Sequence, residues 1–225
     1  MFPKLNHSWN LSVEEAELLQ KEYAGKVVAS DGFHSEIQTV AGVDVAYETN
    51  TESLVAAVVI IRYPSFEIIE SVTVKDAVNF PYVPGLFSFR EIPPIIKAFA
   101  KLESTPDLIV CDGHGFAHPR RFGLACHLGV LFDVPTIGCA KTNLLGRYVK
   151  TGNKRGAFED IVDKGEVVGR IVWTRDDVNP VYVSIGHRIS LPTACQWILR
   201  LTPRYRLPET TRKADQAANK KLDKI

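Results

Sequence analysis

The sequence has 225 residues, enough for one large domain or two small ones and for a sizeable hydrophobic core. Hydrophobic residues make up 45% and charged residues 24%, which excludes a disordered or fibrous chain. The net charge of +1 by itself gives no sign of a polyanionic partner, but residues 1–112 hold 8 of the 27 Lys and Arg and 16 of the 26 Asp and Glu. The net charge is therefore −8 in residues 1–112 and +9 in residues 113–225, an asymmetry that points to nucleic acid.

The cellular setting also follows from composition. The longest purely apolar run, residues 54–61, is too short to cross a bilayer, and residues 1–10 lack the apolar segment of a secretory signal. None of the four cysteines lies in a Cys-x-x-Cys pair, which argues against a structural zinc site or a disulfide framework. No repeat or low-complexity linker interrupts the chain. We therefore expect a single domain over residues 1–225, in a reduced, cytoplasmic, monomeric protein without membrane contact.

The N-terminal half predicts a helix followed by a meander of strands. Ser12 and Glu15 have the spacing of a capping box, which predicts a helix over about residues 12–24. Apolar, β-branched runs predict three strands, at residues 40–47, 54–63 and 66–74.

The rest of the chain alternates helices and strands. A proline-rich loop at residues 79–85 precedes a helix, and Pro93 and Pro94 favour a late start for it because proline is tolerated in the first turn. A late start leaves Glu91 free for other work, although Ser88 and Glu91 also have capping-box spacing. The remaining predicted elements are a strand at 107–112, a helix at 121–132, a strand at 136–140, strands at 166–173 and 181–185, a helix at 191–201, and a basic, mobile tail at 216–225. The order predicts an α/β fold whose mixed sheet has a three-strand meander followed by parallel strands, flanked by helices.

Two acidic residues lie in predicted buried strands, where carboxylates are rare. Asp44 lies within the apolar run 40–47, and Asp112 ends the strand 107–112. Burying an unpaired carboxylate costs several kcal/mol, so each acid needs a cation, hydrogen-bond donors or a raised pKa. The position of Asp44 would also be explained if its side chain capped a turn or formed an ion pair with a single Lys or Arg. If the two strands are neighbours, about 4.8 Å apart, their carboxylates can share a metal. Oxygen ligands favour Mg²⁺ or Mn²⁺, and Glu91 could supply a third carboxylate.

Other residues suggest contact with nucleic acid. Residues 141–155 contain five Lys or Arg and no acid, which is typical of a phosphate track or of a solvated loop. His118 begins a His-Pro-Arg-Arg run that places donors just past Asp112. Tyr82, held between prolines, could fill the core or act as a wedge between stacked bases.

Together these motifs resemble the endonuclease V family, whose members are nucleases that repair deaminated bases and have a ribonuclease H-like fold. The match runs in the family's order from about residue 40 to residue 215. The matching segments are residues 42–44 (GVD), 63–65 (YPS), 81–85 (PYVPG), 89–91 (FRE), 112–120 (DGHGFAHPR), 134–138 (VPTIG), 140–141 (AK) and 186–187 (GH).

The resemblance implies roles for individual residues. Asp44 and Asp112 would bind the catalytic Mg²⁺, for which Mn²⁺ can substitute, and Glu91 would complete the acidic site. Lys141 would lie beside the scissile phosphate. Tyr82 would be the wedge. The residues implied to lie by the flipped hypoxanthine or to contact the DNA are Pro84, Gly85, Gly113, His118 and Arg120.

The resemblance also implies an activity. Family enzymes cut the second phosphodiester bond 3′ to deoxyinosine in double- or single-stranded DNA and leave 3′-hydroxyl and 5′-phosphate ends. Two alternatives stay open: a ribonuclease H-like nuclease that prefers inosine-containing RNA or branched and mismatched DNA, and a metal-free nucleic-acid-binding protein that reuses the fold.

The sequence departs from the family pattern near its C-terminus. Residues 207–212 read LPETTR, where the family usually has LPEPTR, so Thr210 replaces the second proline. This puts in doubt the local backbone and the role of Asp215 as a further carboxylate near the metal.

Overall fold

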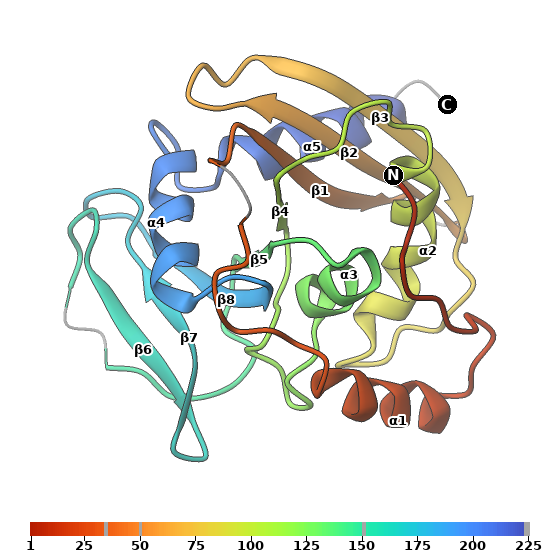
Figure 1. The fold of residues 1–225 in the computed structure, drawn as a ribbon, viewed down its shortest axis with the longest axis horizontal. Helices are drawn as coiled ribbons and strands as arrows, with labels where there is room; N and C mark the ends of the chain where they lie inside the picture. Colours follow the sequence, from red (N-terminus) through yellow and green to blue (C-terminus); the bar gives the residue numbers. More distant parts are fainter. Residues whose placement is uncertain (34–35, 50, 150–151, 223–225) are drawn as a thin grey trace.

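The fold is built on one mixed sheet of eight strands in the order β3-β2-β1-β4-β5-β8-β7-β6, with helices against both faces (Figure 1). The computed structural model describes residues 1–33, 36–49, 51–149 and 152–222. None of the helices in this part of the chain is both long and apolar enough to cross a bilayer.

The sheet confirms the predicted meander and the parallel strands that follow it. Strands β1 (Thr39–Tyr47), β2 (Ser53–Arg62) and β3 (Ile68–Ala77) pair antiparallel in sequence order. Strands β4 (Leu108–Cys111) and β5 (Thr136–Ala140) then continue parallel to β1. Strands β8 (Val181–His187), β7 (Glu166–Val172) and β6 (Phe158–Asp163) extend the sheet antiparallel. Sequence patterns did not predict β6 because most of its side chains are solvent-accessible and it has no apolar run.

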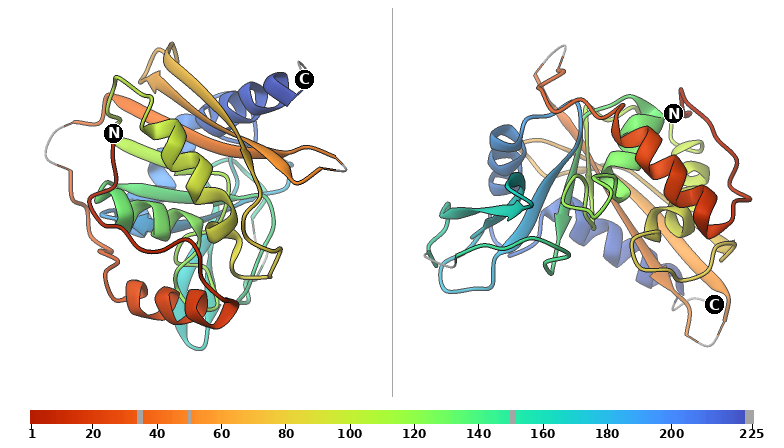
Figure 2. Two further views of the ribbon diagram at one scale, coloured as in Figure 1. Left: turned by 90° about the vertical axis from the view of Figure 1, so that its right-hand side faces the viewer. Right: turned by 90° about the horizontal axis from the view of Figure 1, so that it is seen from below.

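The described part of the chain has five helices, which form the two outer layers (Figure 2). Helices α1 (Val13–Ala24), α2 (Phe87–Phe99) and α3 (Leu124–Phe132) enclose one hydrophobic core, and α1 begins with the predicted capping box. Helices α4 (Leu191–Leu201) and α5 (Glu209–Leu222) enclose the other core. The sheet is therefore covered on both faces, which explains why β2 reads as an almost continuous apolar run.

The predicted late start of α2 is wrong. The helix begins at Phe87, so Pro93 and Pro94 lie in its interior and leave two carbonyls of the first turn without a backbone donor. Tertiary packing offsets this cost, because Phe89 is buried in an aromatic cluster with the N-terminal segment and α3. The alternative capping box of Ser88 and Glu91 is absent, since both residues are inside the helix and Leu86 is its N-cap.

The predicted mobile tail is also wrong over most of its length. Residues 216–222 are the last turns of α5, which packs across β1 and β2 with Ala214 and Ala218 fully buried. The tail is polar and basic on its exposed side only, so composition hid an amphipathic helix. Residues 223–225 lie outside the described residues.

The carboxylate of Asp133, at the C-terminus of α3, ties the N-terminal segment to β8. It accepts hydrogen bonds from Arg188 Nε (2.5 Å), Lys4 Nζ (3.2 Å) and His187 Nε2 (3.3 Å). Partial burial raises the pKa of Asp133, but these hydrogen bonds outweigh it and bring the pKa to about 2.

We expect Asp133→Asn to lower the free energy of unfolding at pH 7 by about 1 kcal/mol, after allowance for solvent screening. Asn keeps the left-handed backbone that position 133 requires (φ 55°). Because the folded-state pKa is depressed, the stabilisation is complete above the unfolded-state pKa of about 4 and declines as the pH falls toward 2. Urea denaturation at pH 7, 5 and 3 measures this, and a difference independent of pH would contradict it.

Candidate active site

Most of the candidate site residues line a cavity of about 610 Å³ at one end of the parallel strands. Strands β1 and β4 are neighbours in register at Val43 and Cys111, and the Asp112 amide donates to the Val43 carbonyl (3.2 Å). Asp44 and Asp112 therefore lie side by side, as the sequence predicts. Lys141 follows the last residue of β5, the next strand of the sheet.

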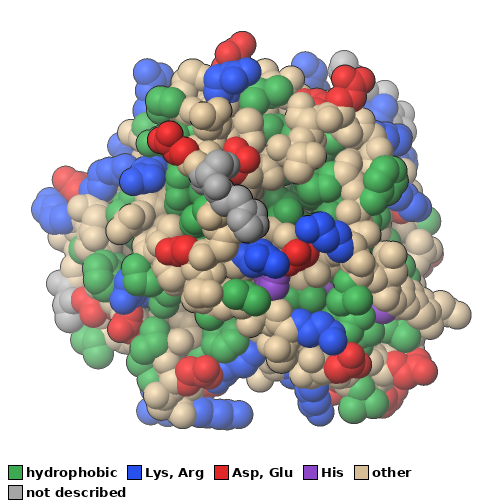
Figure 3. All heavy atoms as spheres, in the orientation of Figure 1, with side chains coloured by type: hydrophobic (Ala, Val, Ile, Leu, Met, Phe, Trp, Pro, Cys, Tyr) green, Lys and Arg blue, Asp and Glu red, His purple; other side chains and the backbone are tan. Residues whose placement is uncertain are grey.

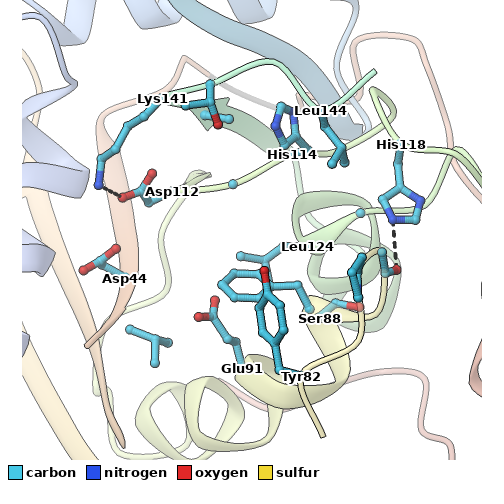
Figure 4. A pocket seen from close by; sticks show the side chains of 18 of the residues that line it. Asp44, Tyr82, Ser88, Glu91, Asp112, His114, His118, Leu124, Lys141 and Leu144 are labelled. Carbon is cyan, nitrogen blue, oxygen red and sulfur yellow. Dashed lines mark hydrogen bonds and ion pairs between the residues drawn. The ribbon is translucent and has the colours of Figure 1, made fainter. Parts of the chain in front are cut away.

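Three of the acids that line this cavity, Asp44, Glu91 and Asp112, are labelled in Figure 4. Glu91 reaches it from α2, is 3% exposed, and accepts a hydrogen bond from the Tyr47 hydroxyl (3.0 Å). Burial raises the pKa of Asp44, and the neighbouring Asp112 carboxylate raises it further. Burial likewise raises the pKa of Glu91 well above its usual range. The hydrogen bond from Tyr47 lowers this pKa, but the charges of Asp44 and Asp112 raise it further. The site thus brings together carboxyl groups whose charged forms disfavour one another, and a bound cation would relieve that repulsion.

Lys141 supplies the one ammonium group that the described part of the cavity wall contains. Its Nζ lies 2.5 Å from Asp112 Oδ2, and the side chain is about half exposed. Burial lowers the pKa of Lys141, but the bond to Asp112 and the charges of Asp44 and Asp215 outweigh it and raise the pKa. Lys141 therefore stays protonated, with one side open to a ligand.

The donor set fits a hard divalent cation. The acids offer only oxygen atoms, which suit Mg²⁺ or Mn²⁺. Within the described ranges, no three Asp, Glu, His or Cys side chains already converge as a ready-made metal site. Mg²⁺ accepts this arrangement because it retains several waters and uses only one or two carboxylates directly.

Asp215 also lines the cavity, from α5. Thr210 lies in the first turn of α5, where proline is also tolerated, so either residue at position 210 is compatible with the helix that carries Asp215. The charge of Asp215 acts on both Asp44 and Lys141. Asp215 is therefore a fourth carboxylate at the site.

The opposite end of the cavity is formed by the loop before α2. Tyr82 stands at the rim and is 73% exposed, so it does not fill the core. Pro84, Gly85 and Gly113 also line the cavity. Gly85 has φ +82°, a left-handed backbone that favours glycine, and a Cβ there would lie 2.7 Å from the Arg120 guanidinium.

His118 and Arg120 hold this loop from behind. The Gly85 carbonyl accepts hydrogen bonds from His118 Nε2 (2.9 Å), Arg120 Nη2 (3.0 Å) and Gln20 Nε2 (3.0 Å). His118 Nδ1 accepts from the Arg120 amide (3.2 Å), so both ring nitrogens are used. His118 lines the cavity, whereas Arg120 is not among its lining residues and also pairs with Glu17 (3.0 Å). Contact of these two residues with DNA stays a prediction.

Gln20 and Ser88 are among the residues of the cavity wall that the sequence did not reveal. Gln20 was read only as part of a helix, yet it is 1% exposed and also donates to the Phe122 carbonyl (2.9 Å). Its helical spacing from the buried Ala16 and Tyr23 was the available signal. Ser88 was weighed only as a cap, although it stands between the loop and Glu91 on the cavity side of α2.

Two described members of the basic run at residues 141–155, Lys154 and Arg155, bind partners within the protein. The Arg155 guanidinium donates to the main-chain carbonyls of Thr174, Thr202 and Leu199, and Lys154 pairs with Asp177 (3.2 Å). Lys150 lies outside the described residues. On the face shown in Figure 3, basic and acidic side chains are interspersed. Among the described members of the run, Lys141 is the charged residue that lines the cavity.

Comparisons of sequence and of structure with known proteins point to one family. The family model described as Endonuclease V matches residues 21–216. The endonuclease V of Nostoc sp. is 47% identical over 213 residues, which cover 95% of this chain and 96% of that protein. The crystal structure of endonuclease V from Streptomyces avermitilis superposes with a TM-score of 0.92 at 43% identity, covering 100% of this chain and 99% of that one.

Two further structures place the fold. Ciona intestinalis endonuclease V, solved with a 24mer DNA containing an inosine followed by a ribo-adenosine, has a TM-score of 0.84 at 33% identity and covers 95% of this chain and 98% of its own. A. aeolicus Argonaute, at 16% identity and a TM-score of 0.54, covers 85% of this chain with 30% of its own length and shares the fold alone. The ribonuclease H-like α/β fold is thus confirmed, and by the family model and the full-length similarity the chain belongs to the endonuclease V family.

Proposed function

We propose that this protein is a Mg²⁺-dependent DNA repair endonuclease that recognises deoxyinosine and hydrolyses the second phosphodiester bond 3′ to it, leaving 3′-hydroxyl and 5′-phosphate ends. One observation carries the proposal: Asp44, Glu91 and Asp112 line the same cavity as the exposed Tyr82. The choice of substrate is supported by the structure of Ciona intestinalis endonuclease V, which was solved with inosine-containing DNA.

Asp44, Asp112 and Glu91 are the proposed holders of the ion, with Asp215 nearby. Bound Mg²⁺ would neutralise charge on the scissile phosphate and make a water molecule a better nucleophile, and Mn²⁺ would serve as well. Tyr47 orients the Glu91 carboxylate through its hydroxyl. Lys141 would turn its exposed ammonium to the phosphate and stabilise the charge that develops there.

The other end of the cavity would receive the lesion. We assign to Tyr82 the role of a wedge that fills the gap left by the displaced base, since its ring is exposed at the rim. Gly85 and Gly113 leave room for a base beside the backbone. We assign His118 and Arg120 to positioning the loop, because both donate to the Gly85 carbonyl.

A cleavage assay with mapped product ends tests this function. On a duplex with a single deoxyinosine we expect one cut, at the second bond 3′ to the lesion, that requires Mg²⁺ or Mn²⁺ and stops with chelator. A matched duplex with adenine at that position is the control. Lesion binding with no cleavage under any metal would instead favour a binding protein that reuses the fold.

Tyr82→Ala should weaken binding to deoxyinosine DNA by roughly ten- to a hundredfold, because base–aromatic stacking contributes about 1–3 kcal/mol. Tyr82→Phe retains the ring and should bind like the wild type. The measurement is fluorescence anisotropy with Ca²⁺ in place of Mg²⁺, alongside a duplex without the lesion. Equal preference for inosine over adenine in wild type and Tyr82→Ala would remove the wedge role.

A second substrate has support from one relative. The Ciona intestinalis enzyme was solved on DNA with a ribo-adenosine directly after the inosine. We therefore propose inosine-containing RNA as an alternative substrate of this chain. Rates on otherwise identical DNA strands with a deoxyribose or a ribose 3′ to the inosine decide between the two: a strong gain with ribose favours RNA, and equal rates favour DNA.

A further inference from the structure

A chain of hydrogen bonds runs from the cavity wall into the interior. Ser88 Oγ lies 3.0 Å from His127 Nδ1, and His127 Nε2 lies 2.8 Å from His7 Nε2. His7 Nδ1 in turn lies 2.6 Å from the carbonyl oxygen of Ser8. The chain thus links α2, α3 and the N-terminal segment.

The last member of this chain sets the direction of every bond. The Ser8 carbonyl has no proton, so His7 Nδ1 must donate to it. In a neutral imidazole the other nitrogen then accepts, which makes His127 Nε2 the donor to His7. His127 Nδ1 is consequently an acceptor, and the Ser88 hydroxyl must donate its only proton to it.

Both imidazoles are held in the neutral state that this direction requires. His127 is fully buried, with the rings of Trp9, Phe89 and Phe122 packed around it. Burial lowers the pKa of His127 well below its usual range, and burial also lowers the pKa of His7. An additional proton on either imidazole would reverse the direction of some of these hydrogen bonds. Because burial disfavours that proton, the direction of the hydrogen bonds stays fixed at neutral pH.

As a result, Ser88 Oγ, in the cavity wall, can accept a hydrogen bond but has no proton left to donate. Ser88 is 2% exposed and lies in the first turn of α2, close to the loop that carries Tyr82 and Gly85 (Figure 4). Hypoxanthine carries a proton on ring nitrogen N1 and can donate it to such an oxygen. Adenine has a lone pair on N1 and would face lone pair against lone pair.

We propose that Ser88 is a specificity-determining residue that accepts a hydrogen bond from N1–H of the flipped base and so discriminates hypoxanthine from adenine. This inference rests on the proposed function. For Ser88 to donate to adenine N1, it would have to leave His127 Nδ1 buried without a partner, which is costly. Guanine also carries a proton on N1, so this contact acts against adenine only.

Ser88→Ala tests the contact directly on two duplexes that differ in one base, deoxyinosine or deoxynebularine, a purine whose N1 has no proton. We expect Ser88→Ala to lower kcat/KM on deoxyinosine about tenfold, the effect of one net hydrogen bond, and to leave the rate on deoxynebularine unchanged or higher, because the opposed lone pairs are gone. The preference for inosine therefore falls at least about tenfold. A preference equal to that of the wild type would overturn the proposal, whether or not both rates drop.

A second variant tests the direction of the hydrogen bonds from Ser88 to Ser8 without changing a residue that lines the cavity. His7→Phe removes the acceptor for His127 Nε2–H, so His127 can take either tautomer and Ser88 becomes free to donate. We expect the preference for inosine over nebularine to fall several-fold. Trp9→Phe, in the same aromatic cluster but outside the hydrogen-bond chain, is the matched control and should keep the wild-type preference. Loss of preference in Trp9→Phe and His7→Phe alike would show a packing effect and overturn the role of the chain.

The wild-type protein separates this inference from the function on which it rests. A wild type that does not prefer deoxyinosine over adenine would refute the proposed function itself. A wild type that prefers it, together with a Ser88→Ala variant that keeps the whole preference, would refute only the role of Ser88.

Discussion

Replacing either Asp44 or Asp112 with asparagine should lower kcat/KM on deoxyinosine DNA by at least about a thousandfold. A thousandfold loss corresponds to roughly 4 kcal/mol of transition-state stabilisation, the scale of a charge placed at the reacting phosphate. Both side chains meet on adjacent parallel strands, so either change removes half of the pair proposed to hold the ion. The measurement is single-turnover cleavage with Mg²⁺ and with Mn²⁺.

The same variants should remain folded. Burial and the neighbouring Asp112 disfavour the charged form of Asp44 and raise its pKa, so a neutral amide at position 44 should keep or raise the free energy of unfolding. Asp76→Asn is a matched control, because Asp76 forms an ion pair with Lys97 (2.6 Å) away from the cavity and should cleave like the wild type. Near wild-type cleavage by either Asp44→Asn or Asp112→Asn would show that the metal assignment is wrong.

Gly42→Ala should lower the free energy of unfolding by more than about 3 kcal/mol. We expect the same variant to lose cleavage activity. Gly42 lies in the middle of β1 between Val59 and Val110, directly beneath the first turn of α5. A Cβ at this position would lie 2.2 Å from the backbone of Thr210 and 2.7 Å from the amide of Thr211. Since the strand is held on both sides, α5 must move, and Asp215 moves with it.

Urea denaturation and cleavage of the same preparation measure this effect. Gly25→Ala is the control, because Gly25 has φ −67° and an added Cβ would make only an ordinary contact of 3.5 Å with the Glu22 carbonyl. We expect Gly25→Ala to unfold at the wild-type urea concentration. A Gly42→Ala protein with an unchanged midpoint would mean that α5 is not seated on β1 as closely as the structure has it.

Local sequence signals predicted most elements well, and they failed where distant packing decides. The capping box at Ser12 is a contact within one turn, so the start of α1 could be predicted. The start of α2 could not, because the burial of Phe89 against the N-terminal segment overrides Pro93 and Pro94. The tail at 216–222 reads as polar because only its small alanines face β1 and β2.

By itself the sequence determined the fold class and the family, and it singled out three of the acids that line the cavity, Asp44, Glu91 and Asp112. Asp44 and Asp112 could be found because a carboxylate in a buried strand is conspicuous wherever the strand lies. Only the tertiary structure decided what the polar neighbours do: Arg120 and His118 hold the Gly85 carbonyl, and Ser88 joins His127. A hydrogen bond between residues far apart in the chain depends on which groups the fold brings within about 3 Å, and no local pattern records that distance.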